Sequence, residues 1–220
     1  MKNSLLVLGC SLILANAAQS ALIQGKVSVP TRSEKPAAAS SYSRGEYLPA
    51  VTTQAAEPAE SGEESWIVVW AKPLDGPATF VQPNGKLEMV QQNKTFSPHV
   101  LPIQTGSTVS FPNLDPLYHN VFSYSQAKRF DLGRYQQGKS KNITFDKPGI
   151  VEVYCEIHET MLAYIVVVDT PYFVRADKDG SFKIDAPPGN YRLFAWIPNR
   201  SSEPKDLDLT AAGAAINFSF

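Results

Sequence analysis

Short runs of alternating apolar and polar residues, separated by turn-forming residues, are the main pattern along this chain. Two early apolar runs, 21–29 and 66–71, are typical of strands. Clusters of Pro, Gly, Asn and Asp then recur at short intervals, and no long amphipathic helix pattern occurs. The same pattern predicts further strands over 86–91, 95–103, 108–111, 119–124, 142–145, 151–154, 164–168, 172–176, 182–184, 191–196, 206–209 and 215–220.

These predicted strands fall into two groups, which indicates an all-β fold with more than one sandwich. The strands of 170–220 lie too far along the chain to complete a small sandwich with those of 86–169. We therefore expect a second module. Residues 30–65 are rich in Pro, Ala, Ser, Thr and Glu, and they predict a mobile loop because they hold few large apolar side chains.

The N-terminal segment, residues 1–21, has the organisation of an export signal. Lys2 gives a positive start, residues 4–14 are apolar, and residues 15–21 are mostly small, as in a cleavage region. The apolar run is far shorter than the about 20 residues of a membrane span. We expect export to the periplasm. Cys10 lies inside this run and leaves a lipoprotein signal as the less favoured alternative.

Composition excludes several classes of function. The formal net charge of −1 argues against binding to nucleic acid or to strongly anionic membranes. No Gly-rich phosphate loop or Ser-His-Asp spacing occurs, and the chain has three histidines in all. The sequence therefore offers few histidines for histidine-based catalysis.

Removal of the signal segment leaves Cys155 as a cysteine without a partner. Exported proteins meet oxidising conditions, in which cysteines form disulfides or are exposed to reaction. A lone cysteine in such a compartment is best explained as one whose thiol is bound to another group. The alternative is a buried, inert thiol.

Cys155 begins a Cys-x2-His-x2-Met sequence with His158 and Met161, and His119 offers a second imidazole upstream. Two histidines, one thiolate and a weak axial methionine are the ligand set of a mononuclear blue-copper site. We predict one copper ion per chain, with His119, Cys155 and His158 in the equatorial plane and Met161 axial. Taken alone, His119 would be a core histidine and Met161 a core side chain.

Landmark residues around these ligands are also in a recognisable order, and over residues 86–169 the sequence resembles the cupredoxins. The short ligand loop looks most like that of amicyanin. By this resemblance, Asn120 ties the strand of His119 to the loop that carries Cys155. The matching positions are Phe96, Pro98, Gly106, Val109, Phe111, Asn113, His119, Asn120, Val121, Pro148, Gly149, Tyr154, Cys155, His158 and Met161.

The segments that flank residues 86–169 are similar to a narrower bacterial group, the methylamine-utilisation-like cupredoxins. Such proteins combine a cupredoxin with a transthyretin-like module of the carboxypeptidase regulatory type. The resemblance implies that 22–85 and 170–220 are the two parts of that module and that the cupredoxin is inserted between them.

The resemblance implies an exported one-electron carrier that exchanges electrons with redox partner proteins through His158. The alternatives are a protein that holds copper without redox turnover and a β-sandwich interaction module. A copper enzyme is disfavoured because it needs more histidines, and only His99, expected to face solvent, is left. The basic side chains of 128–147 form a solvated face or a docking surface for an acidic partner.

Overall fold

The computed structural model describes residues 20–29, 65–76, 81 and 85–220, and every regular element in these ranges is a strand, as the sequence predicted. None of the described residues forms a helix that could cross a membrane. The predicted signal segment, apart from its last two residues, and the predicted loop, apart from Ser65, lie outside the described residues. The strands are β1 (Ala21–Ser28), β2 (Val68–Pro73), β3 (Val90–Gln92), β4 (Thr95–Ser97), β5 (Val100–Gln104), β6 (Thr108–Pro112), β7 (His119–Ser123), β8 (Phe130–Tyr135), β9 (Ser140–Thr144), β10 (Gly149–Tyr154), β11 (Leu162–Val168), β12 (Phe173–Arg175), β13 (Ser181–Ala186), β14 (Gly189–Ile197), β15 (Arg200–Ser201), β16 (Lys205–Leu209), β17 (Ala214–Ala215) and β18 (Phe218–Ser219).

Strands β3 to β11 form one sandwich, called here the inserted module (85–169). Its main sheet has the order β5-β11-β10-β7-β8, with β5 and β11 parallel and the other pairs antiparallel. The hairpin β3–β4 and the pair β6–β9 pack on one face of this sheet. The core between them includes Met89, Phe96, Ile103, Val109, Phe111, Val121, Phe145, Val151, Val153 and Ile165.

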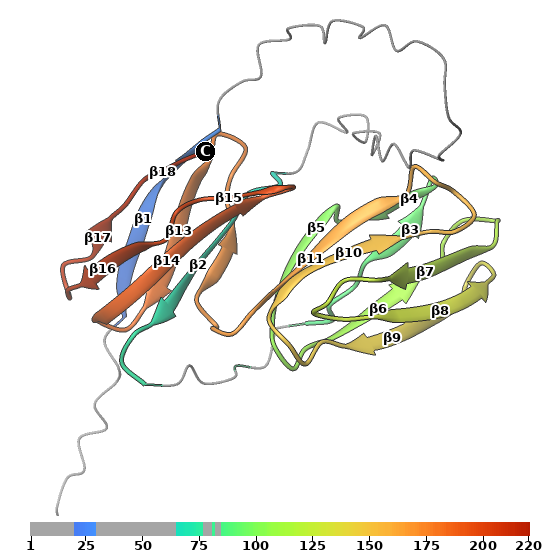
Figure 1. The fold of residues 1–220 in the computed structure, drawn as a ribbon, viewed down its shortest axis with the longest axis horizontal. Coiled ribbons are helices and arrows are strands. Elements are labelled where there is room, and N and C mark those ends of the chain that lie inside the picture. The colour runs from blue at the N-terminus through green and yellow to red at the C-terminus, as the bar shows by residue number, and fades with distance from the viewer. Residues whose placement is uncertain (1–19, 30–64, 77–80, 82–84) are drawn as a thin grey trace, which may run out of the picture.

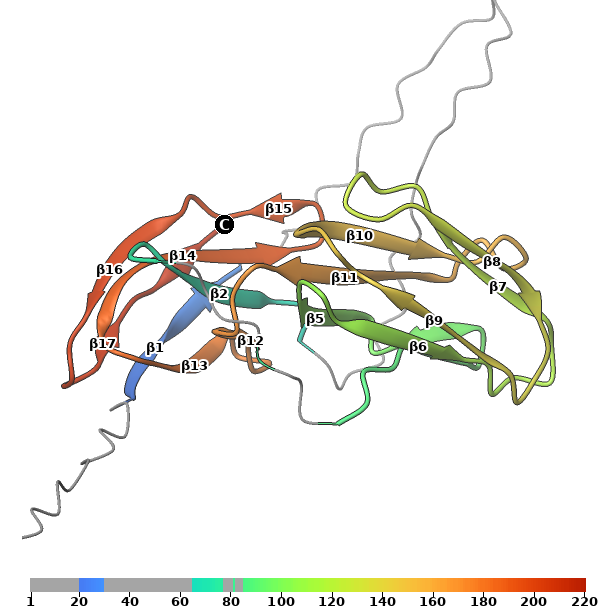
Figure 2. The ribbon, with the colours of Figure 1, turned by 90° about the horizontal axis from the view of Figure 1, so that it is seen from below.

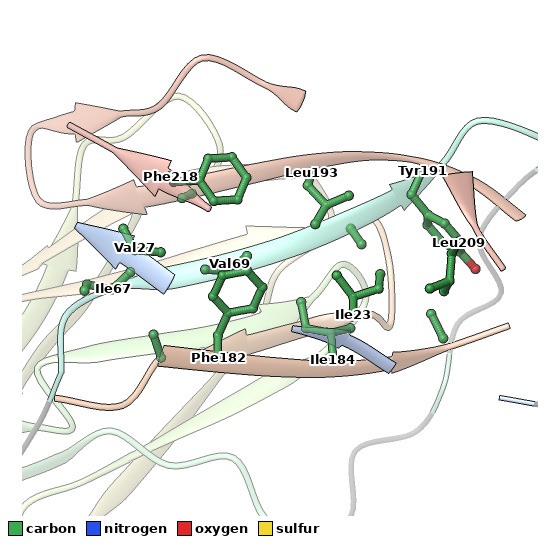
Figure 3. Close-up of a cluster of buried hydrophobic side chains, with 14 of the residues drawn as sticks. Ile23, Val27, Ile67, Val69, Phe182, Ile184, Tyr191, Leu193, Leu209 and Phe218 are labelled. Atoms are coloured by element: carbon green, nitrogen blue, oxygen red, sulfur yellow. The ribbon is translucent and has the colours of Figure 1, made fainter. Parts of the chain in front are cut away.

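The remaining strands form a second sandwich, called here the outer module, from sequence segments on both sides of the inserted module (Figure 1). One sheet contains β13, β1, β17 and β18, and the other contains β12, β2, β14, β15 and β16. The chain leaves after β2 and returns as β12, which pairs with β2 at Phe173 and Trp70. Figure 3 shows the apolar side chains of the two sheets pointing toward one another, among them Ile23, Val69, Phe182, Leu193 and Phe218.

Gly25 in β1 marks the tightest approach in the outer module. A Cβ at this position would lie 1.7 Å from the carbonyl oxygen of Ile216. The Ile216 amide also donates to the Gln24 carbonyl at 2.9 Å. Only glycine therefore lets the C-terminal segment lie against β1.

Strand β11 joins the two modules because it is buried on both faces. Side chains alternate along a strand, so Ala163, Ile165 and Val167 enter the core of the inserted module. Tyr164, Val166 and Val168 point the other way, into a separate cluster. This junction cluster, which holds the modules side by side in both views (Figure 1 and Figure 2), also contains Val100 from β5, Val68 from β2 and Trp196 from β14, with Trp66, Trp70, Ile150, Leu162 and Phe173 packed against it.

Some strands of the structure differ from the sequence predictions. The predicted strand 95–103 is two strands, because β4 pairs with β3 whereas β5 pairs with β11. Pro98 lies between them and has no amide hydrogen for a ladder. Strand β8 was not predicted, because exposed Asp131, Gly133 and Arg134 hide its alternation. Trp196 is buried in the junction cluster, and Trp66 and Trp70 are half-buried against the same cluster.

Removal of Trp196 tests the junction. We expect Trp196→Ala to lower the free energy of unfolding by about 3–5 kcal/mol, since the ring is buried and leaves a cavity. Amides of β11 should then exchange faster in hydrogen-exchange measurements, although β11 belongs to the other module. Phe182→Ala, in the core of the outer module, is the control and should affect β11 less. Unchanged exchange in β11 of Trp196→Ala would contradict the account.

Candidate metal centre

Three of the four predicted ligands lie together at one end of the inserted module. His119 is the first residue of β7, Cys155 follows the last residue of β10, and His158 lies in the turn before β11. Cys155 Sγ is 3.6 Å from Nδ1 of His119 and 3.8 Å from Nδ1 of His158. The two Nδ1 atoms are 3.0 Å apart, and the donor atoms of all three residues lie within 4.8 Å of one another.

Strand pairing explains why residues far apart in sequence meet here. Tyr154, next to Cys155, pairs with Phe122 of β7 and with Leu162 of β11. The loop 155–161 therefore closes directly over the ends of two paired strands, beside the strand that begins with His119. The amide of Met161 donates to the carbonyl of His158 at 3.0 Å, which tightens the loop into a turn.

The donors differ in their exposure. His119 is fully buried, and Cys155 is a buried free thiol. His158 is only half-buried, so its ring is the part of the cluster nearest to solvent. Met161 is 1% exposed and packs in the same apolar core as Cys155. Its role as an axial ligand stays a prediction.

Asn120 links the two ligand-bearing segments, as the resemblance implied. Its side-chain oxygen accepts a hydrogen bond from the Glu156 amide at 2.9 Å, and its amide nitrogen donates to Asp131 at 2.7 Å. One side chain thus connects β7, the loop 155–161 and β8. Asn120 itself is 2% exposed, whereas its partners Asp131 and Glu156 lie at the surface.

Asp115 is a site residue that sequence reasoning missed. Its Oδ2 lies 2.8 Å from Nε2 of His119, and its two oxygens accept hydrogen bonds from the amides of Asn93 and Lys94 at 2.7 and 2.8 Å. In the sequence it stood in a Pro/Asn-rich stretch, 112–116, that indicated only a turn. The one available signal was the spacing of an acid four residues before a candidate ligand.

A buried polar network supports Asp115. The amide of Asp115 donates to the side chain of Asn113, which itself donates to the carbonyls of Leu117 and Tyr135. Asn113 is fully buried, and Tyr135 lies opposite His119 in the β7–β8 pair. The backbone on both sides of His119 is therefore held by hydrogen bonds as well as by apolar packing.

Electrostatics at the site favour an ionised Asp115 and a neutral His158 ring. Burial by itself raises the pKa of Asp115, but hydrogen bonds from Lys94, His119 and Asn93 hold the pKa below its usual range. Burial lowers the pKa of His158, the charges of His119 and Lys94 lower it further, and Asp115 acts in the opposite direction. A lowered pKa keeps the His158 ring neutral, and a neutral ring nitrogen can bind a metal.

His99 lies outside this cluster, and the expectation that it faces solvent is wrong. Its ring is half-buried and lies 4.5 Å from that of Trp66 and 5.6 Å from that of Tyr164. Tyr164 belongs to the junction cluster. His99 thus packs with aromatic rings beside the contact between the modules.

Comparisons with known proteins give matches among solved structures. No family model matches the chain, and no curated protein matches it. Among solved structures, it is similar to a purple cupredoxin from Nitrosopumilus maritimus, with 22% identity over 38% of this chain and 100% of that one, at a TM-score of 0.35. A Cu(I) form of an amicyanin variant is 17% identical over 44% of this chain and 98% of that one, at a TM-score of 0.36.

A third similar structure is a copper-containing nitrite reductase from Thermus scotoductus. It is 27% identical over 44% of this chain, at a TM-score of 0.37. The match spans only 25% of the reductase.

Replacement of Asn120 tests how the loop is held. We expect Asn120→Ala to free the Glu156 amide, which should then exchange faster, and to raise the rate at which a thiol reagent modifies Cys155 in metal-free protein. Metal affinity should fall about 10–100-fold, as for other residues that orient ligands. Asn142→Ala, at an exposed position in β9, is the control. Equal thiol reactivity in the two variants would contradict the role of Asn120.

Proposed function

We propose that this chain is an exported copper protein that carries single electrons between redox partner proteins. The observation that carries the proposal is the convergence of two imidazoles and one thiolate within 4.8 Å at the ends of paired strands. His119, Cys155 and His158 would hold one copper ion, with Met161 as the axial ligand. We also propose that the inserted module is a cupredoxin domain and that the outer module is a transthyretin-like domain.

The donor spacing fits a single metal ion. In protein zinc sites, bonds of about 2.0 Å to nitrogen and about 2.3 Å to sulfur place such donors roughly 3.3–3.8 Å apart. The sulfur–nitrogen distances of 3.6 and 3.8 Å fall in that range, and the nitrogen–nitrogen distance of 3.0 Å is slightly shorter. His158 is half-buried, and we expect its ring to move slightly away from His119 when a metal binds.

The ligand types favour copper among the metals. A His2Cys set with a weak methionine is the set of blue-copper electron-transfer sites, whereas structural zinc sites use four strong ligands. Copper bound here would supply one-electron chemistry between Cu(I) and Cu(II). The protein contributes donors on rigid strand ends and a core that excludes water from Cys155 and His119.

Exposed apolar side chains flank both histidine ligands in the sequence and support exchange with protein partners. Leu114, Leu117 and Tyr118 lie in the loop before His119, and Ile157 adjoins His158. Each is at least 38% exposed. A partner that covers them would exclude water next to His158 and bring its own redox centre close to the cluster.

Histidine supply disfavours a second copper centre. The chain has three histidines, two of them are in the cluster, and His99 packs against Trp66 and Tyr164 instead.

The proposal of export rests on the sequence of residues 1–21, which predicts periplasmic localisation.

Two ligand variants test the proposal. Cys155→Ser should abolish the intense visible band of the copper-loaded protein, because that band arises from charge transfer between sulfur and copper. Met161→Gln should keep copper and the band but lower the reduction potential, because the axial ligand helps to set it. Absorption spectra and voltammetry provide the measurements. A serine variant that remains blue would refute the ligand assignment.

Charge placed beside His158 tests the exchange surface. We expect Ile157→Lys to slow electron self-exchange at least about tenfold, because two copies that meet at this surface would bring like charges together. Line broadening in mixtures of reduced and oxidised protein measures the rate. Leu74→Lys, at an apolar position of the outer module that is 46% exposed against 38% for Ile157, is the control and should change little. A similar loss in both variants would place electron exchange elsewhere.

A further inference from the structure

Asp115 is a buried carboxylate whose hydrogen-bond partners are unusually well defined. It is 6% exposed, and its oxygens meet the His119 ring and the amides of Asn93 and Lys94 within 2.8 Å. Both amides can only donate. An ionised carboxylate can only accept, so the third partner must donate as well, through a proton on Nε2 of His119.

The position of that proton decides which atom of the ring is available to a metal. A neutral imidazole with its proton on Nε2 presents the lone pair of Nδ1. Nδ1 is the atom that lies 3.6 Å from Sγ of Cys155 and 3.0 Å from Nδ1 of His158. The opposite tautomer would direct a proton into the cluster and a lone pair at a carboxylate.

The fold, rather than the histidine, orients the carboxylate. Asn93 and Lys94 have φ values of 55° and 56° and form the two-residue connection between β3 and β4. Their left-handed conformation turns both amides toward Asp115. The backbone of Asp115 is also fixed, through its amide, by Asn113. The hairpin thus holds the acid at the remote edge of the His119 ring.

We propose that Asp115 is a positioning residue that fixes His119 in its Nε2-protonated tautomer before any metal binds and strengthens it as a ligand afterwards. The second part rests on the proposed function, whereas the first concerns the metal-free protein. A carboxylate that accepts the remote N–H raises the donor strength of an imidazole ligand. A stronger nitrogen donor favours Cu(II) over Cu(I), so Asp115 holds the reduction potential down.

A purely structural role would be to cap the β3–β4 turn. Such a role affects stability but leaves the tautomer of His119 and the potential unchanged. Three readouts separate the two roles in the full-length protein: the histidine tautomer from 15N NMR of metal-free protein, the affinity for Cu(II) and the reduction potential.

In wild-type protein we expect His119 to carry its proton on Nε2. Asp115→Asn should allow a mixture of tautomers, weaken Cu(II) binding about 10–100-fold and raise the potential. Asp115→Glu should change the tautomer, the Cu(II) affinity and the reduction potential less, because it keeps the negative charge. Two controls should leave the tautomer and the potential as in wild type. Ile103→Val removes one methyl group from the same core, and Asp146→Asn removes an exposed acid.

The wild-type tautomer alone decides the first part, even if a variant fails to fold. A proton on Nδ1 of His119 in the metal-free protein would overturn the proposal, as would an unchanged tautomer and potential in a folded Asp115→Asn variant. Absence of copper binding by wild-type protein would instead overturn the proposed function and leave the tautomer assignment standing.

Discussion

The burial of β11 on both faces is the constraint on which the rest of the structure depends. Side chains of one parity fill the core of the inserted module, and those of the other parity fill the junction with the outer module. A one-residue shift of this strand would exchange the two sets. The register with β10 is therefore fixed, and with it the position of the loop that connects the two strands. Cys155, His158 and Met161 all lie in that loop.

Hydrogen-bonded polar groups inside the apolar core fix the orientation of the candidate ligands. His119, Asn113, Asn120 and Asp115 are buried, and each has at least one hydrogen-bond partner. An unpaired polar group in such a place costs about 1–3 kcal/mol, so alternative arrangements of these side chains are disfavoured. Apolar packing sets the strands, and this network sets the orientation of the ligands on them. The proposed change of oxidation state with little movement would need both.

Sequence patterns were sufficient for the parts of the structure that rest on local rules. Strand rhythm predicted the all-β class, and the spacing of Cys155, His158 and Met161 identified the loop. Long-range pairing was less accessible. Strand β8 carries exposed polar residues and was not predicted. In the run 95–103 Pro98 indicated a break, but not that the two halves join different sheets.

The role of Asp115 could not be predicted from its neighbours in sequence. It depends on the amides of Asn93 and Lys94, which reach it only because the β3–β4 hairpin packs beside the segment between β6 and β7. The place of His99 depends in the same way on the contact between the modules, which brings Trp66 and Tyr164 around its ring. In both cases the partners are far apart in the chain and carry no common motif.

In the proposed centre, the fold brings two histidines and one cysteine together as ligands of a single copper ion. X-ray absorption at the copper edge of protein loaded with one equivalent of Cu(II) tests this most directly. The account predicts a shell with one short copper–sulfur bond and two imidazole nitrogens. A shell made only of nitrogen and oxygen ligands would contradict it, because Cys155 would then not be a ligand.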